Sequence, residues 1–163
     1  MVRVQIMARL RMQREEVVMF KLKRAYEEPE RSDGFRVLVE RLWPRGVSGE
    51  KAALDLWMKD IAPSPDLRAW YAHDPAKFEE FRKRYREELH RQQELIDDLL
   101  RRGAQGTVTL VYAASDEERN SAVVLKAVLE RQAARHFRRP ASARTRVLSR
   151  RPRTRRKRMR VAA

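Results

Sequence analysis

The sequence predicts an α/β protein: a small, mostly parallel sheet of three or four strands, flanked by helices in a single compact domain. Three segments, at 19–26, 35–42 and 106–113, have the apolar and β-branched composition of strands. Between the second and third of them lie some sixty residues with apolar side chains at helical spacing. Because parallel strands need a long crossover connection, this order favours parallel pairing of those two strands.

The two N-terminal strands differ in pattern. Residues 19–26 alternate apolar and lysine side chains, which is typical of a half-buried strand at a sheet edge. The second strand holds three consecutive apolar residues at 37–39, which predicts a central strand buried on both faces. Only eight residues join these strands, which is short for a parallel crossover, so the direction of the first strand stays open.

Helices are predicted from capping residues and apolar stripes. Serine or aspartate followed by proline marks two helix starts, and a glycine marks one helix end. The predicted helices run from Ser48 through Trp57, from Ser64, from Asp74, over a stripe at 95–100 that ends at Gly103, and over 121–132.

The net charge of +15 is concentrated in the ends of the chain. Residues 135–163 carry thirteen Lys and Arg and no acid, residues 1–18 carry four against two, and residues 19–134 carry no net charge. The C-terminal segment has too few apolar residues to offset the entropy of ordering, so we predict a basic disordered tail. Such a tail would bind nucleic acid phosphates non-specifically. The alternative is that it arises from read-through of a GC-rich frame.

Several classes of chemistry are excluded by composition. The chain has no cysteine, which removes disulfides, thiolate nucleophiles and cysteine-ligated metals. Its three histidines, at 73, 90 and 136, do not have the spacing of a zinc site, and we predict no metal and no cofactor. No apolar run approaches the roughly 20 residues of a membrane span. We therefore predict a cytoplasmic protein without a membrane partner, while the oligomeric state stays open.

The first group of candidate site residues follows the second strand. Arg41, Trp43 and Arg45 come just after its carboxyl end, where open α/β sheets hold ligands. If the loop curls, the two guanidinium groups can face one anion, with the Trp43-Pro44 step, as a cis peptide, holding the curl. The alternative is that each arginine pairs with a local acid, such as Glu40, Asp55 or Asp60.

The three tryptophans are predicted to have different roles. Trp43 lies in the predicted loop, so its ring could stack on a nucleobase. Trp57 and Trp70 fall in predicted helices, and helical tryptophans usually pack in a core.

The second group follows the third strand. Tyr112, Asp116 and Asn120 would share a rim of the sheet with the arginine loop if the two strands are parallel. A carboxylate there could act as a general base or hold a divalent cation. The favoured alternative is capping of the next helix by the acids at 116–118. The secondary candidates are Glu118 in this loop and His73, which either transfers protons or closes a turn between helices.

Residues 19–133 also resemble a known family. The resemblance rests on Lys23-Arg-Ala-Tyr26, Asp33-Gly-Phe-Arg-Val-Leu-Val39, Arg41-Leu-Trp-Pro-Arg-Gly46, Lys51-Ala-Ala-Leu-Asp-Leu-Trp57, Lys59-Asp-Ile-Ala-Pro-Ser64, Leu67-Arg68, His73-Asp-Pro75, Thr107-Val-Thr-Leu110 and Tyr112-Ala-Ala114. On these motifs the chain is similar to the uncharacterised YeaO-like family, domain of unknown function 488. The resemblance implies a compact two- or three-layer α/β domain and no established activity.

The chain departs from the family pattern at the second rim loop and at its ends. Glu40 stands where the family usually has Asp, and Arg119 and Ser121 stand where it usually has His, which weakens a metal or general-base role here. Family members usually begin near Met19, so we predict an N-terminal extension at 1–18, a YeaO-like domain at 19–134 and the basic tail at 135–163. The corresponding hypothesis is that translation starts at Met19 or Val18.

The predicted function is a pocket for a small anionic compound, a nucleotide or a phosphate ester, at the carboxyl rim of the sheet. Whether this pocket binds or also catalyses stays open at this stage. The alternative function is a non-catalytic module that binds nucleic acid or a protein partner with its basic tail.

Overall fold

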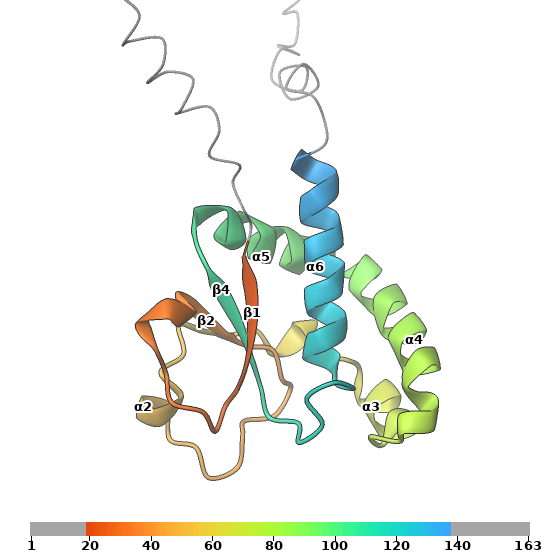
Figure 1. Cartoon of the computed structure of the whole chain (residues 1–163). Coiled ribbons are helices and arrows are strands. Elements are labelled where there is room, and N and C mark those ends of the chain that lie inside the picture. The colour runs from red at the N-terminus through yellow and green to blue at the C-terminus, as the bar shows by residue number, and fades with distance from the viewer. Residues whose placement is uncertain (1–18, 138–163) are drawn as a thin grey trace, which may run out of the picture.

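The computed structural model describes residues 19–137, and its centre is a sheet of four parallel strands (Figure 1). The strands lie in the order β1 (Phe20–Arg24), β4 (Val108–Tyr112), β2 (Phe35–Leu38) and β3 (Leu56–Trp57). This confirms the predicted parallel α/β class. It also fixes the direction of the first strand, because β1 and β2 both pair in parallel with β4, which lies between them.

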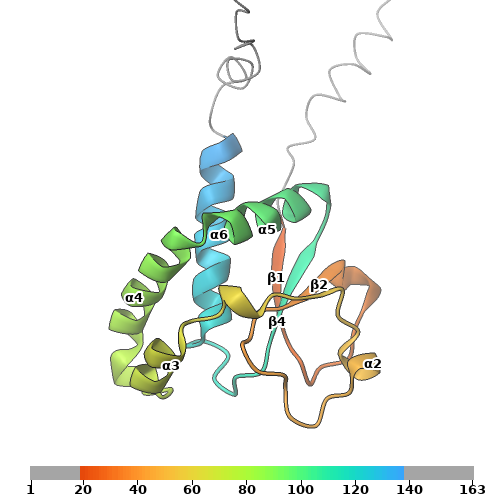
Figure 2. The ribbon, with the colours of Figure 1, turned by 180° about the vertical axis from the view of Figure 1, so that it is seen from behind.

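The helices lie on both sides of the strands. Figures 1 and 2 show α4 and α6 to one side of the sheet and the short α2 to the other. The remaining bounds are α2 (Gly49–Ala52), α3 (Pro65–Tyr71), α4 (Phe78–Arg91), α5 (Gln93–Gln105) and α6 (Ser121–Phe137), with 3₁₀ turns at Arg31–Asp33, Lys59–Ile61 and Pro75–Lys77.

The main core lies between the sheet and the long helices. Alternate strand residues such as Val37 and Leu110 point to this side, where they are fully buried against Ile96 and Leu125. Fully burying an aliphatic side chain of this size stabilises a fold by about 1.5–3 kcal/mol. The predicted central strand is confirmed, since residues 37–39 are all buried, and β1 is the predicted edge strand.

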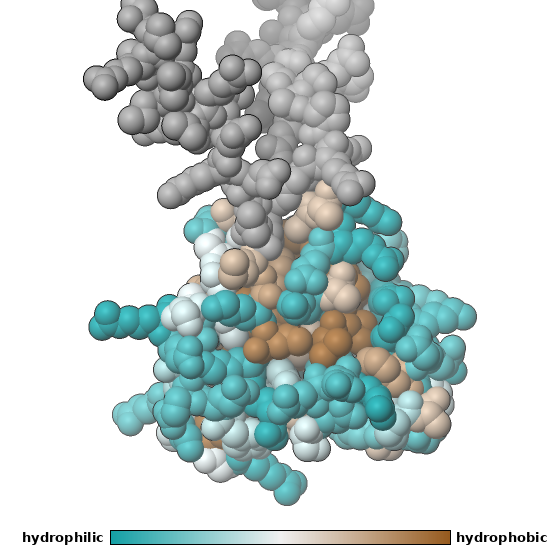
Figure 3. All heavy atoms as spheres, in the orientation of Figure 1, coloured by the Kyte–Doolittle hydropathy of each residue, from teal (hydrophilic) through white to brown (hydrophobic). Residues whose placement is uncertain are grey.

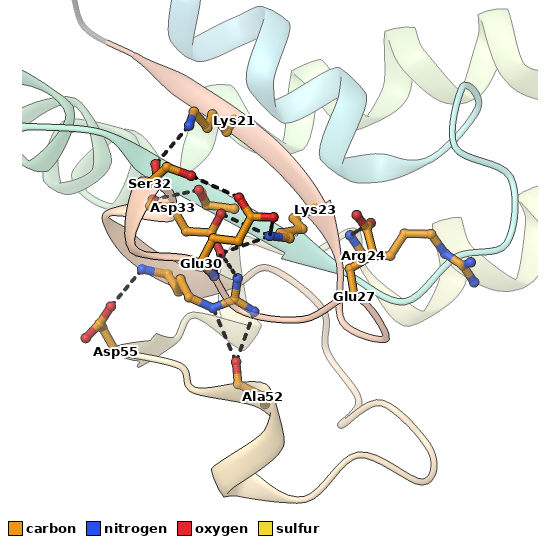
Figure 4. Close-up of polar contacts among 11 residues, drawn as sticks. Lys21, Lys23, Arg24, Glu27, Glu30, Ser32, Asp33, Ala52 and Asp55 are labelled. Atoms are coloured by element: carbon orange, nitrogen blue, oxygen red, sulfur yellow. Dashed lines mark hydrogen bonds and ion pairs between the residues drawn. The ribbon is translucent and has the colours of Figure 1, made fainter.

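The opposite face of the sheet carries a buried ionic cluster of Lys23, Asp33 and Arg36 (Figure 4). The ammonium of Lys23 lies 3.3 Å from both carboxylate oxygens of Asp33, and the guanidinium of Arg36 pairs with the same carboxylate. Arg36 also donates to the carbonyl oxygen of Ala52 from Nε at 3.3 Å and from Nη2 at 3.0 Å. The cluster therefore holds α2 and the turn before β2 against the sheet. Sequence reasoning missed it.

The helix predicted from Ser48 through Trp57 is wrong beyond Ala52. Ser48 does cap α2, but Ala53 adopts a left-handed conformation with φ of 46° and ends the helix. The chain then extends, and Leu56 and Trp57 pair with β2 as the edge strand β3. Trp57 is 42% exposed, which contradicts its predicted core position, whereas Trp70 packs half-buried against the core.

The predicted helix end at Gly103 is also wrong. Gly103 is buried inside α5, which continues to Gln105, and the backbone N–H of Gly106 still donates to the carbonyl of Arg102 at 3.2 Å. The N-terminal extension and nearly all of the basic tail fall outside the described residues, so the predictions made for them stay predictions. Within 19–137, none of the helices has the length and apolarity needed to cross a bilayer.

Candidate functional site

A cleft of about 580 Å³ opens at the carboxyl edge of the sheet. One wall comes from residues 42–45 after β2, and another from α3 with Arg68 and Tyr71. The floor and far side come from residues 113–114 after β4 and from Asn120 and Ser121 at the start of α6. The loops that follow β2 and β4 therefore meet at one rim, as parallel pairing requires.

Two indole hydrogen bonds fix the loop after β2. The Nε1 of Trp57 donates to the carbonyl oxygen of Glu40, and the Nε1 of Trp43 donates to that of Val47, both at 2.7 Å. The two rings meet edge to face, with centroids 5.4 Å apart. Gly46 completes the turn with φ of 73°, a left-handed conformation that suits glycine. The result is a fixed loop that presents Arg45 and Trp43 to the cleft.

Arg41 and Arg45 were predicted to face one anion together, and this arrangement is not observed. The Trp43–Pro44 peptide is trans rather than cis, and Arg45, but not Arg41, lines the cleft. Arg41 is half-buried, and its Nε has no hydrogen-bond partner among the described residues. The alternative of ion pairs with local acids is not observed within 19–137 either, and Asp55 instead accepts from the backbone N–H of Arg36.

Arg68, rather than Arg41, lines the cleft together with Arg45. It lies on α3, which begins where the hydroxyl of Ser64 accepts from the backbone N–H of Leu67 at 3.2 Å. The carboxylate of Glu88 accepts from the backbone N–H and the hydroxyl of Ser64, at 2.9 and 2.6 Å, and so ties α3 to α4. Sequence reasoning singled out no arginine beyond the strand-end loop, although Leu67-Arg68 was among the motifs of the family resemblance.

The loop after β4 uses its polar side chains to hold its own backbone. One carboxylate oxygen of Asp116 accepts from the N–H groups of Glu118 and Arg119, both at 2.9 Å. These two hydrogen bonds lower the pKa of Asp116, and the bond from Arg119 has the larger effect. Asn120 accepts from the N–H of Val123 at 3.0 Å as the N-cap of α6, and its amide donates to the carbonyl of Asp116. Asp116 itself does not line the cleft, whereas Asn120 does.

The remaining predicted residues divide between the core, the surface and the rim. Tyr112 is buried in the core and does not line the cleft, and burial raises its pKa. Glu118 is exposed and also lies away from the cleft lining. His73 is on the rim in a left-handed conformation with φ of 56°, and its ring centroid lies 5.7 Å from that of Tyr71. It thus sits at the turn between α3 and α4.

The charged groups that line the cleft are mostly basic. Glu40 is the one carboxylate among the described lining residues, and its Oε1 accepts from the backbone N–H of Ala113 at 3.2 Å. Arg45 and Arg68 make no ion pair within the part of the chain that the structure describes. The N-terminus of α6 also lines the cleft and adds the partial positive charge of a helix dipole. In residues 19–137 no three acidic or histidine side chains gather in a way that could hold a metal ion.

The chain is similar to several bacterial proteins. It is 42% identical over 106 residues to the uncharacterized protein Rv3073c of Mycobacterium tuberculosis, an alignment that covers 65% of this chain and 89% of that protein. It is 39% identical over 103 residues to the uncharacterized protein YeaO of Escherichia coli, covering 63% of this chain and 90% of YeaO. No solved structure matches.

A family model also matches residues 19–146, and its description reads "Inactive DUF488-N3 subclade". The match spans the whole of the described domain, including both rim loops and α3. With the identities to YeaO and its mycobacterial relatives, it shows that this chain is a member of the YeaO-like DUF488 family.

Proposed function

We propose that the cleft binds a small anionic compound, a nucleotide or a phosphate ester, and holds it without converting it. The observation that carries this proposal is the pair Arg45 and Arg68. They come from different elements, line the same cleft, and have no carboxylate partner among the described residues. Several other arginines of the described domain are paired with acids, as Arg84 is with Glu80.

An anion suits this arrangement for two reasons. The guanidinium group offers parallel N–H donors that match the oxygens of a phosphate or carboxylate in bidentate geometry. The start of α6 lines the opposite wall, and helix N-termini favour negative charge. Both sources of positive charge face one cavity, so a bound phosphate would interact with all of them.

The flanking surface suits the rest of a nucleotide. Trp43 lines the cleft, is 37% exposed, and is held by its hydrogen bond to Val47. A fixed indole face can stack on a nucleobase at little entropic cost. The cleft volume, about 580 Å³, falls within the range of roughly 300–1,000 Å³ that small-molecule sites span.

Binding without turnover is supported by the hydrogen bonds that already occupy the polar groups around the cleft. The carboxylate of Asp116 accepts two backbone hydrogen bonds, and one oxygen of Glu40 accepts a third. The hydroxyl of Tyr71 donates to the carbonyl of Arg119 at 2.7 Å, and burial raises its pKa, so the hydroxyl keeps its proton and is not available as a base. The description of the matching subclade as inactive agrees with a binding role.

The proposal is tested with the full-length chain and adenosine 5′-monophosphate as the probe. We expect the melting temperature to rise with AMP concentration, by an increment equivalent to about 2.7 kcal/mol at one hundred times the Kd. Adenosine should give a much smaller shift, and phosphorus NMR should show AMP unchanged after prolonged incubation with stoichiometric protein. Equal shifts with adenosine and AMP, or none with either, would contradict the anion site, and consumption of AMP would contradict binding without turnover.

The basic-tail module remains the alternative function. Nearly all of the tail lies outside the described residues, so the geometry of the domain does not bear on it. The AMP experiment separates the two, because a chain that works only through its tail would show no melting shift with AMP.

A further inference from the structure

A second hollow lies between α4 and α6, and its lining shares no residue with that of the cleft. Its volume is about 160 Å³, and Figures 1 and 2 show that the two helices are neighbours in the fold. Its charged and polar lining consists of Arg86 and His90 from α4 and Arg131, Gln132 and Arg135 from α6. We call it the basic groove. No acidic residue lines it.

The spacing of the two arginines of α6 brings like charges together. Arg86 and His90 are four residues apart on α4, and Arg131 and Arg135 are four apart on α6, so each pair shares one helix face. Like charges at this spacing destabilise a helix unless an opposite charge offsets them. The groove therefore gathers positive charge at some cost to the fold.

Elsewhere on the same helices, three basic side chains are paired with acids. Arg82 pairs with Glu79, Arg84 pairs with Glu80 at 2.9 Å, and Lys126 pairs with Glu130 at 3.3 Å. Within 19–137 the arginines of the groove have no such acid partner, and the glutamine beside them is engaged with Gln93 at 2.9 Å. Among the described residues, the groove arginines thus form a basic surface without an acid partner, between two helices on which Arg82, Arg84 and Lys126 are paired.

We propose that the basic groove binds the phosphate backbone of duplex DNA. Three of its four basic residues are arginines, whose bidentate N–H donors match phosphate oxygens. Arg135 also begins a run of charge in the sequence, because residues 138–163 contain twelve Lys and Arg and no Asp or Glu. A polyanion with evenly repeated phosphates can engage the groove and this run together, which a short acidic peptide cannot do as well.

This proposal is independent of the one made for the cleft, because none of the groove residues lines the cleft. It also differs from binding by the tail alone, since it assigns part of the affinity to folded residues. DNA binding through the groove can therefore be present or absent whatever the outcome of the AMP experiment.

The test measures fluorescence anisotropy of a labelled duplex of about 20 base pairs with the full-length chain over 50–300 mM KCl. Each phosphate contact contributes about −0.9 to the slope of log K against log salt. The double variant Arg131→Gln/Arg135→Gln should therefore bind several-fold more weakly, with a slope smaller by up to about 1.8. Melting curves of each variant confirm that it is folded.

The matched control is Arg84→Gln/Arg101→Gln, which removes the same charge from arginines paired with Glu80 and Asp98 outside the groove. It should change affinity and slope much less. A third variant, Arg155→Gln/Arg156→Gln/Arg158→Gln, measures how much of the DNA affinity comes from the tail. The proposal is overturned if the groove variant binds with the affinity and slope of the unsubstituted chain. It is also overturned if the control weakens binding equally, if the chain does not bind DNA at 50 mM KCl, or if poly-glutamate displaces the duplex at equal charge concentration.

Discussion

The hydroxyl of Tyr71 donates a hydrogen bond of 2.7 Å to the carbonyl oxygen of Arg119, 48 residues along the chain. This bond joins the last residue of α3 to the loop before α6, which are two walls of the cleft. Burial raises the pKa of Tyr71, and the negative charge of Asp116 raises it further. The hydroxyl therefore keeps its proton and remains a donor throughout the neutral range.

Removing that hydroxyl should loosen the cleft. We expect Tyr71→Phe to lower the free energy of unfolding by about 0.5–1.5 kcal/mol, because the buried ring stays while one hydrogen bond is lost. Urea unfolding followed by circular dichroism measures this. Tyr26→Phe is the control, since Tyr26 is an exposed residue of the same cleft. Equal losses in the two variants would show that the bond to Arg119 contributes nothing.

Asp33 should control the acid stability of the domain. Burial alone would raise the pKa of its carboxyl, but the backbone N–H of Glu30 and the side chains of Lys23 and Arg36 outweigh burial, and the pKa is lowered. A carboxyl with a lowered folded-state pKa stabilises the fold above its unfolded pKa of about 3.9, and this stabilisation is lost as the pH falls below that value.

The substitution Asp33→Asn leaves Lys23 and Arg36 buried without their counter-charge. We expect it to cost about 3–5 kcal/mol at pH 7, and we expect the variant to lose less stability than the unsubstituted protein between pH 6 and pH 3. Denaturant melts at several pH values measure both effects. Asp98→Asn, which removes a surface partner of Arg101 and Arg102, should cost less than about 1 kcal/mol. A cost at Asp33 no larger than at Asp98 would refute a stabilising role for the buried cluster.

Two glycines with positive φ should respond differently to alanine. A Cβ added at Gly34, where φ is 62°, would lie 2.2 Å from the backbone oxygen of Thr107, so Gly34→Ala must shift the chain beside β4. At Gly46, where φ is 73°, an added Cβ meets nothing within 4 Å, and only the backbone conformation is strained, by about 1–2 kcal/mol. In thermal melts, the melting temperature of Gly34→Ala should be well below that of Gly46→Ala. Similar melting temperatures for the two would contradict the close approach at Thr107.

The indole of Trp57 should restrain the loop that carries Arg45. We expect Trp57→Phe to keep much of the ring packing but to lose the hydrogen bond to Glu40, and so to speed amide hydrogen exchange in residues 40–47. Mass spectrometry of the exchanged peptides measures this locally. Trp70→Phe is the control, because Trp70 packs against the core and its ring lies under the guanidinium of Arg84 on α4. Unchanged exchange in 40–47 after Trp57→Phe would show that the loop is held by other contacts.

The elements predicted correctly are those whose pattern of apolar residues indicates burial. Residues 37–39 are apolar in succession because β2 is covered on both faces, and that pattern is visible without coordinates. The strand at Leu56–Trp57 was missed for the opposite reason. It has only two residues, and it follows a run of good helix formers. The left-handed residue that ends α2 is Ala53 and not a glycine, so the sequence gives no sign that the helix ends there.

The position of the cleft could be predicted from the sequence more accurately than the residues that line it. Parallel strands bring the segments after β2 and β4 to one edge, so the position of the cleft follows from topology. Which arginine faces the cleft depends instead on the turn at 44–47 and on the placement of α3, neither of which a local pattern encodes. For this reason Arg41 was named from the sequence, whereas Arg68 lines the cleft. The cluster around Asp33 was missed because its three charged members are spread over two strands and a turn.

The central claim, that Arg45 and Arg68 hold one anion, is tested most directly by a double-mutant cycle. Calorimetry would give the Kd of AMP for the full-length chain, for Arg45→Gln, for Arg68→Gln and for the double variant. The account predicts about a tenfold loss for each single variant and a coupling energy of at least about 0.5 kcal/mol, because both side chains contact the same phosphate. Affinities unchanged in both single variants, or losses that simply add, would contradict it.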